Sequence, residues 1–159
     1  MRELLKSKTR RIELVMAFVL FIIEGLLYLT FRSTELNMFR LYEHAGPWVE
    51  ELRSWGDTID LPVWVRYSLP DGMWLFSYLL LVDAIWNKFD KSSFVWYVLM
   101  PGVAFGSELL QLYSHNSSSR WYTGTYDVMD LVCYGFAVLF IVIIYISKNF
   151  IRKQINYNA

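Results

Sequence analysis

Residues 127–147 read DVMDLVCYGFAVLFIVIIYIS, and the only charged side chains in this stretch are Asp127 and Asp130 at its start. A helix of this length spans the ~30 Å hydrocarbon core of a bilayer. It also satisfies its own backbone hydrogen bonds where no water is present. We therefore expect residues 127–147 to form a membrane-spanning helix.

Three more stretches have a similar length and are nearly as apolar: residues 12–31, 69–86 and 93–113. The first follows a basic segment, as the core of a signal peptide does. It is longer than such a core, and no small-residue cleavage site follows it, so we interpret it as a retained span. The sequence thus predicts an all-α integral membrane bundle of four transmembrane helices, in a single domain over residues 1–159.

The composition agrees with this class. Hydrophobic residues make up 55% of the 159 residues and charged residues 19%, below the roughly 25% of an average soluble domain. Charge is balanced, with 15 Lys and Arg against 15 Asp and Glu, which argues against nucleic acid as a partner. The single cysteine, Cys133, excludes an internal disulfide and a cysteine-based zinc site.

The positive-inside rule gives the orientation, because Lys and Arg gather on the cytoplasmic side. Ten of them lie in the N-terminal tail, the link between the second and third spans, and the C-terminal tail. The other five are Arg32, Arg40, Arg53, Arg66 and Arg120, in two longer loops. We expect both termini to be cytoplasmic, in the inner (plasma) membrane, with the lipid bilayer as a partner.

The outer loop, residues 32–68, is too long to be only a connector. Pro47 can begin a short helix in it, which places Trp48, Val49, Leu52 and Trp55 on one face and Glu50, Glu51 and Arg53 on the other. This pattern predicts an extracytoplasmic helix that lies on the membrane and caps the bundle. The alternative is a lid over an outward-facing pocket.

Ionisable residues within membrane spans are costly and indicate function by default. The predicted orientation brings most of those in this chain to one depth, in the outer leaflet. They are Asp71, Glu108, Gln111, Asp127 and Asp130, with Glu24 slightly deeper. Only Asp83 falls at the inner side. We take Glu108, Asp71 and Asp130 as candidate catalytic residues, and Gln111 and Asp127 as candidate substrate ligands.

Several chemistries fit such a cluster. The carboxyl groups can share protons, hold a divalent cation through hard oxygen ligands, or bind a cationic substrate group. Arg66 and Arg120, with His44 and His115, can add anion binding or acid–base capacity at the mouth of the site. No sequence motif indicates a cofactor or decides whether a metal binds.

Each residue also has a structural interpretation. Ser68 and Asp71 match a capping box with Pro70 in the first helical turn, and Asp127 can cap the fourth helix. Glu108 has no such role, since a negative charge near a helix C-terminus is disfavoured. Asp83 can snorkel to the inner surface. The Gly102-x-x-x-Gly106 motif permits close approach of helices.

The chain resembles the VanZ-like family of small bacterial membrane proteins. The resemblance rests on Asp71 in the second span, Glu108-x-x-Gln111 in the third, and Asp130 with Gly135 in the fourth. It implies a multi-pass protein of the cell envelope, in a family named for glycopeptide resistance, and implies no particular reaction. The sequence departs from the family pattern at four positions: Gly72, Trp74, Gly124 and Tyr134.

The leading functional hypothesis is that the outward-facing carboxylate and amide cluster binds or acts on an envelope component, such as a lipid-linked or cell-wall precursor. Whether the chain is an enzyme stays open. The second hypothesis is a non-enzymatic accessory or scaffold subunit of a membrane protein partner. A proton-coupled transporter is disfavoured, because the acids form no chain across the membrane and the inner half, apart from Asp83, is expected to be apolar.

Overall fold

The computed structural model describes residues 2–32, 47–116 and 126–157, and every regular element in these ranges is helical. The helices are α1 (Arg2–Phe31), α3 (Pro47–Asp57), α4 (Val63–Trp86), α5 (Lys91–Asn116) and α6 (Val128–Tyr157). The all-α prediction is confirmed.

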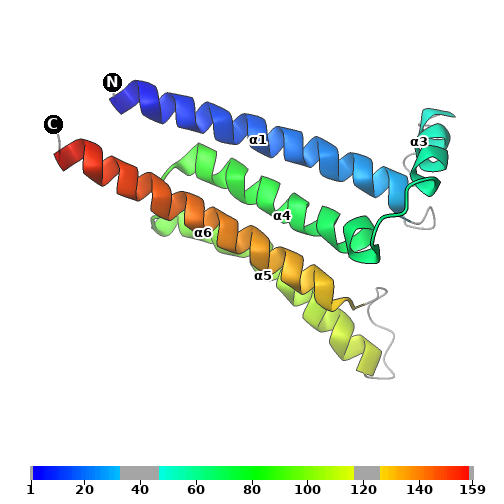
Figure 1. Cartoon of the computed structure of the whole chain (residues 1–159). Coiled ribbons are helices and arrows are strands. Elements are labelled where there is room, and N and C mark those ends of the chain that lie inside the picture. The colour runs from blue at the N-terminus through cyan, green and yellow to red at the C-terminus, as the bar shows by residue number, and fades with distance from the viewer. Residues whose placement is uncertain (1, 33–46, 117–125, 158–159) are drawn as a thin grey trace.

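The four long helices run up and down along one another, with both chain ends at the same end of the bundle (Figure 1). α4 is the central helix, because it packs against α1, α5 and α6. α5 also packs against α6, and α3 contacts the end of α1 that is remote from the N-terminus. Successive long helices are antiparallel. A short connection joins α4 to α5 at one end of the bundle, and longer connections join α1 to α4 and α5 to α6 at the other end.

Three helices are long and apolar enough to cross a membrane, in segments Lys8–Phe31, Lys91–Ser114 and Val128–Ile151. Their mean hydropathies are 2.4, 1.3 and 2.4, and most of their side chains face outward. Phe18 is 65% exposed and Phe140 is 50% exposed. Such large exposed apolar side chains are typical of helices that contact lipid rather than water. These features indicate a multi-pass membrane protein.

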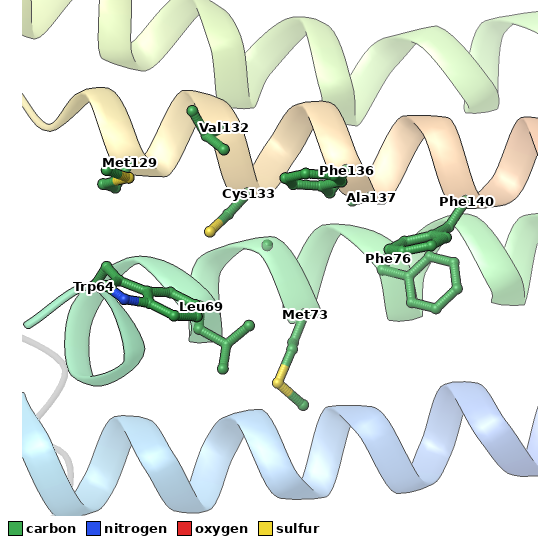
Figure 2. A pocket seen from close by; sticks show the side chains of 11 residues that line it. Trp64, Leu69, Met73, Phe76, Met129, Val132, Cys133, Phe136, Ala137 and Phe140 are labelled. Atoms are coloured by element: carbon green, nitrogen blue, oxygen red, sulfur yellow. The ribbon is translucent and has the colours of Figure 1, made fainter. Parts of the chain in front are cut away.

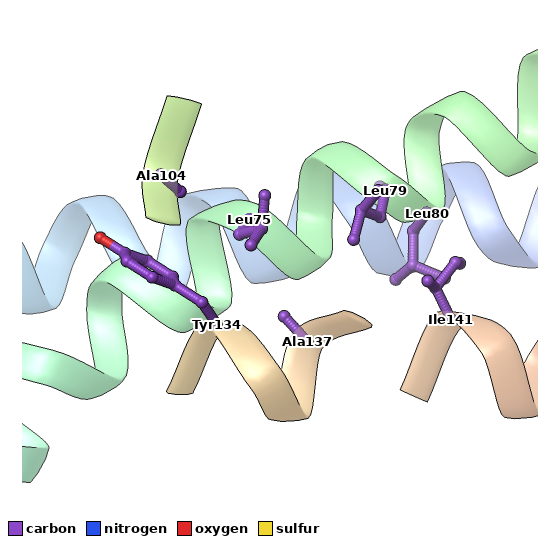
Figure 3. Packing of buried hydrophobic residues seen from close by; sticks show 8 residues of the cluster. Leu75, Leu79, Leu80, Ala104, Tyr134, Ala137 and Ile141 are labelled. Atoms are coloured by element: carbon purple, nitrogen blue, oxygen red, sulfur yellow. The ribbon is translucent and has the colours of Figure 1, made fainter. Parts of the chain in front are cut away.

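α4 is not among these three segments, and it carries Arg66, Asp71 and Asp83. Three leucines of α4 face the interior: Leu75 and Leu80 are completely buried, and Leu79 nearly so. These three leucines pack with Ala17 of α1, Ala104 of α5, and Tyr134, Ala137 and Ile141 of α6 (Figure 3). A single apolar layer therefore joins all four long helices at mid-height.

α4 and α6 pack closely at Gly72 of α4. A Cβ atom there would lie 2.7 Å from Cys133 Cβ and 3.1 Å from the Cys133 carbonyl oxygen on α6. By contrast, no atom lies within 4 Å of a Cβ built on Gly102 or Gly106. Among the described residues, the Gly102-x-x-x-Gly106 motif makes no close helix contact, so that expectation is wrong for this chain.

α4 begins six residues earlier than predicted, at Val63. Ser68, Pro70 and Asp71 therefore lie inside the helix, and the predicted capping box at Ser68 and Asp71 is wrong. The extension is held by Arg66, whose Nη2 donates to the Ile59 carbonyl oxygen at 3.0 Å. Pro70 is fully buried within the helix rather than in its first turn.

The predicted helix at Pro47 is confirmed as α3. Val49 and Leu52 are half-buried, whereas Trp48 and Trp55 are 50% and 61% exposed. Arg53 does not face away as expected. It donates to the carbonyl oxygens of Leu29 at 2.9 Å and Arg32 at 2.8 Å, and so satisfies backbone groups at the end of α1.

Candidate functional site

Carboxylates from three helices meet at the end of the bundle near α3. Asp71 lies on α4, Glu108 on α5 and Asp130 on α6, and Asp127 immediately precedes α6. Glu108 and Asp130 are only 4% and 8% exposed. Glu108 interacts electrostatically with Asp71, Asp127 and Asp130. The structure therefore brings together four of the residues that the sequence singled out.

Asp127 connects these helices through hydrogen bonds. Its Oδ1 accepts from the Met129 backbone N–H at 2.9 Å, which confirms the predicted cap at the start of α6. Its own N–H donates to Glu108 Oε2 at 3.5 Å, and its Oδ2 accepts from Ser68 Oγ at 3.4 Å. The last two contacts are long, so they hold Glu108 and Ser68 only weakly.

Arg32 is the residue of this cluster that the sequence analysis missed. Its Nη2 lies 2.5 Å from Asp71 Oδ2 and donates to the Tyr67 carbonyl oxygen at 2.8 Å. The only sequence signal for Arg32 was its position directly after an apolar span. A basic residue at such a position is ordinarily assigned to the following loop. This guanidinium compensates Asp71, but Glu108, Asp127 and Asp130 have no cation bonded to them among the described residues.

Asp130 Oδ1 is buried and has no hydrogen-bond partner in the described part of the chain. Buried carboxylate oxygens are almost always paired, because leaving one unpaired costs its full desolvation energy. The described residues thus leave this oxygen of the cluster unsatisfied. A proton, a cationic group or a hydrogen-bond donor from a ligand would satisfy it.

Of the other predicted residues, Gln111 and Arg66 do not join the cluster. Gln111 is half-buried on α5, and no hydrogen bond links it to the four carboxylates. Arg66 binds Ile59 and pairs with Asp60 at 3.3 Å instead. Glu24 on α1 is half-buried and interacts with Asp71. Arg120 and His44 lie outside the described residues, as does the side chain of His115.

Within the described ranges, no group of three or more His, Cys, Asp or Glu side chains is placed to hold a metal ion. The divalent-cation interpretation of the carboxylates therefore gains no support from their geometry. Proton sharing and binding of a cationic group stay open.

A second charged cluster lies at the opposite end of the bundle, where the chain termini are. Lys148 Nζ on α6 lies 2.7 Å from Glu13 Oε1 on α1 and 2.7 Å from Asp83 Oδ2 on α4. Tyr97 of α5 donates its hydroxyl to Asp83 Oδ1 at 2.8 Å. These side chains are buried, since Lys148 is 12% exposed, Glu13 6% and Asp83 1%.

This Lys148 network corrects two expectations. Asp83 does not snorkel to the surface, because both of its oxygens are bonded inside the bundle. The inner half was expected to be apolar except for Asp83, but it also contains the buried charges of Glu13 and Lys148. Glu13 and Lys148 are separated by most of the chain, so no short-range spacing in the sequence could have predicted that they pair. The two clusters are about 27 Å apart along α6 at ~1.5 Å per residue, close to the thickness of a bilayer core.

An apolar groove of about 520 Å³ lies between α4 and α6 (Figure 2). Its α4 side includes Trp64, Met73 and Phe76, and its α6 side includes Met129, Val132 and Phe140. The Gly72–Cys133 contact forms its floor. Its size is in the range of small-molecule sites, and its lining suits hydrocarbon.

Comparison of the chain with protein-family models, curated proteins and solved structures finds no match. The resemblance to VanZ-like proteins therefore stays a prediction from the motifs.

Proposed function

We propose that α4 is the fourth membrane span and that the carboxylate cluster faces out of the cell, with both termini in the cytoplasm and the chain in the bacterial plasma membrane. At 24 residues, α4 is about 36 Å long, enough to cross. Its two acids are paired with Arg32 and Lys148, and the helices around it shield them from lipid. The basic residues near the termini support the orientation.

In this setting the function that the geometry supports best is binding of, or action on, an envelope component such as a lipid-linked or cell-wall precursor. One observation carries it: Asp71, Glu108 and Asp130 converge from three helices, and Asp130 Oδ1 is buried with no partner among the residues that the structure describes. A site that needs a donor to be complete is suited to a ligand that supplies one. The motif order shared with VanZ-like proteins supports the same setting.

The residues take different roles in this proposal. Glu108 is the principal ligand or acid–base group, because it is buried and, in the described ranges, its carboxylate accepts only the long hydrogen bond from the Asp127 N–H. Asp130 contributes the unpaired oxygen. Arg32 holds Asp71 in place, and Asp127 joins the cluster to the start of α6.

The test compares Glu108→Gln and Asp130→Asn with Glu51→Gln, an exposed acid on α3. The readouts are growth of a deletion strain under envelope stress and the lipids that co-purify with the chain in native mass spectrometry. We expect both cluster variants to lose complementation and bound lipid while keeping the wild-type unfolding temperature. Unchanged complementation and unchanged lipid content in both, with the protein folded, would overturn the proposal.

The alternative is an accessory or scaffold subunit whose polar clusters only specify helix packing. The Lys148 network favours it, because its ion pairs and the Tyr97 hydrogen bond tie α1, α4, α5 and α6 together. It predicts that Glu108→Gln and Asp130→Asn lower stability or partner co-purification and nothing else. A transporter is disfavoured because the buried apolar layer of Leu75, Leu79 and Leu80 separates the two charged clusters and interrupts a polar path between them.

A further inference from the structure

At the end of the bundle where both chain termini lie (Figure 1), the outer surface of three helices changes from apolar to basic. Exposed isoleucine or phenylalanine and exposed lysine or arginine are separated by less than one helical turn, in residues 11–12 of α1, 91–94 of α5 and 151–153 of α6. Such a boundary marks the level at which a membrane-spanning helix passes from hydrocarbon to lipid headgroups.

Three contacts hold the basic segments side by side. Arg10 of α1 donates to the Ala84 carbonyl oxygen near the end of α4 at 2.8 Å. In the link that follows α4, the ring of Phe89 lies 6.2 Å from that of Tyr145 on α6, measured between centroids. The Lys148 network joins α6 to α1. The start of α1, the α4–α5 link and the last part of α6 therefore meet at this end, although they are far apart in the sequence.

Five exposed basic side chains gather at this end, and we call them the basic collar: Lys8, Arg10, Arg11, Lys91 and Lys153. None of the five forms a salt bridge within the described part of the chain. Lys88 differs from them, because it pairs with Asp90. The buried Lys148 network has two carboxylates and one ammonium, so it offsets at most one collar charge. The collar therefore carries an unbalanced positive charge, which attracts anions.

Exposed aromatic side chains lie next to these charges. Phe89 in the link is 52% exposed, and Phe150, three residues before Lys153, is 62% exposed. A phospholipid presents its anionic phosphate directly above an apolar acyl region, so a surface that joins basic and apolar side chains fits it. A nucleic acid or an acidic peptide would leave the apolar part uncovered. We propose that the basic collar binds the headgroups of anionic phospholipids, in the cytoplasmic leaflet of the proposed orientation. This inference uses no residue of the carboxylate cluster.

The test uses the full-length chain in nanodiscs of phosphatidylglycerol and phosphatidylcholine, in equal amounts and with identical acyl chains. Native mass spectrometry counts the lipids of each kind that stay bound. The first variant combines Lys8→Gln, Lys91→Gln and Lys153→Gln, and so removes one collar charge from each of three helices. These lysines form no salt bridge with the described residues, so the variant should fold as the wild type does. The matched control replaces the same three lysines with arginine and keeps every charge.

We expect the wild type to retain phosphatidylglycerol over phosphatidylcholine by about tenfold, and the glutamine variant by less than about twofold. The arginine variant should keep the wild-type preference. Raising the ionic strength to about 1 M should weaken the preference, because salt screens exposed charges. Equal retention of the two lipids by the wild type would overturn the proposal, as would a preference that the glutamine variant keeps. Equal losses in the glutamine and arginine variants would show that charge is not what binds.

A soluble acidic partner is the alternative occupant of the collar. A fluorescent single-stranded DNA oligonucleotide tests it, added at physiological ionic strength to the chain in nanodiscs of phosphatidylcholine alone. We expect no more oligonucleotide to bind than binds to empty nanodiscs. Oligonucleotide binding that the glutamine variant loses, together with equal retention of the two lipids, would contradict the lipid assignment.

Discussion

One ammonium group, Lys148 Nζ, lies 2.7 Å from carboxylate oxygens of both Glu13 and Asp83, which belong to two other helices. The arrangement places one buried positive charge between two buried negative ones at the end of the bundle where the termini lie. Arg10 adds to it from α1 by donating to the Ala84 and Ile85 carbonyl oxygens, at 2.8 and 3.2 Å, near the end of α4. α1 is therefore fastened to α4 by polar contacts at this end.

Replacing Lys148 with Met should destabilise the chain by ~3–5 kcal/mol, because two buried carboxylates would lose their cation. Lys153→Met, at an exposed position on the same helix, should change stability by less than about 0.5 kcal/mol. Chemical unfolding in detergent measures both. Adding Glu13→Gln to Lys148→Met should restore part of the loss, and a double variant no better than the single one would contradict the network.

Replacing Arg32 with Met should cost less, about 1.5 kcal/mol, because this pair is partly solvated. The side chains of Arg32 and Asp71 are 23% and 25% exposed, against 12% and 1% for Lys148 and Asp83. The same unfolding assay ranks the two variants. A larger loss for Arg32→Met than for Lys148→Met would mean that the outer pair is the more buried one.

Gly72→Ala should destabilise the bundle by about 1–3 kcal/mol, since its Cβ would press on Cys133 and force α4 and α6 apart. Gly102→Ala is the matched control, because nothing lies within 4 Å of its Cβ. It should be neutral or stabilise α5 by up to ~1 kcal/mol through helix propensity. A destabilising Gly102→Ala with a neutral Gly72→Ala would mean that α5 makes the close contact.

Asp90 predicts a pH dependence outside the membrane. Its Oδ1 accepts the N–H groups of Ser92 at 3.1 Å and Ser93 at 2.9 Å at the start of α5. The neighbouring Lys88 ammonium and the Ser93 N–H lower the pKa of Asp90 to about 2. Because the folded value lies below the unfolded value of about 4, the stabilisation is present above pH 4 and is lost as the pH falls toward 2.

Asp90→Ala should therefore lower the unfolding temperature at pH 6, and the difference from wild type should shrink between pH 4 and pH 2. Glu51→Ala, an exposed acid on α3, serves as the control and should show no such trend. Thermal unfolding over this pH range measures both. A difference that stayed constant down to pH 2 would contradict the assigned role of the Asp90 carboxylate.

Much of the fold was predictable because it depends on local patterns. Apolar length gave the candidate spans of α1, α5 and α6, and Pro47 with its amphipathic face gave α3. The cap at Asp127 followed from its place before an apolar run. The α4 start was missed because a proline is expected in the first turn, whereas Pro70 lies inside the helix.

The charged pairs were predictable only in part. Depth along each helix placed Asp71, Glu108 and Asp130 at one level, and the structure brings them together. The depth of a residue along its helix does not reveal which helix faces contact each other. Arg32 was therefore assigned to a loop and Lys148 to a tail, and their ion pairs were not predicted. The same limit applies to Gly102 and Gly106, whose spacing permits a contact that this bundle makes at Gly72 instead.

The central claim is that α4 crosses the membrane with the carboxylate cluster outside, and cysteine labelling in intact cells tests it most directly. In a Cys133→Ala background, Asp60→Cys precedes α4 and Lys91→Cys follows it, both at exposed positions. A membrane-impermeant maleimide should label Asp60→Cys in intact cells and Lys91→Cys only after permeabilisation. Labelling of both positions from the same side, or of Lys91→Cys alone in intact cells, would contradict the account.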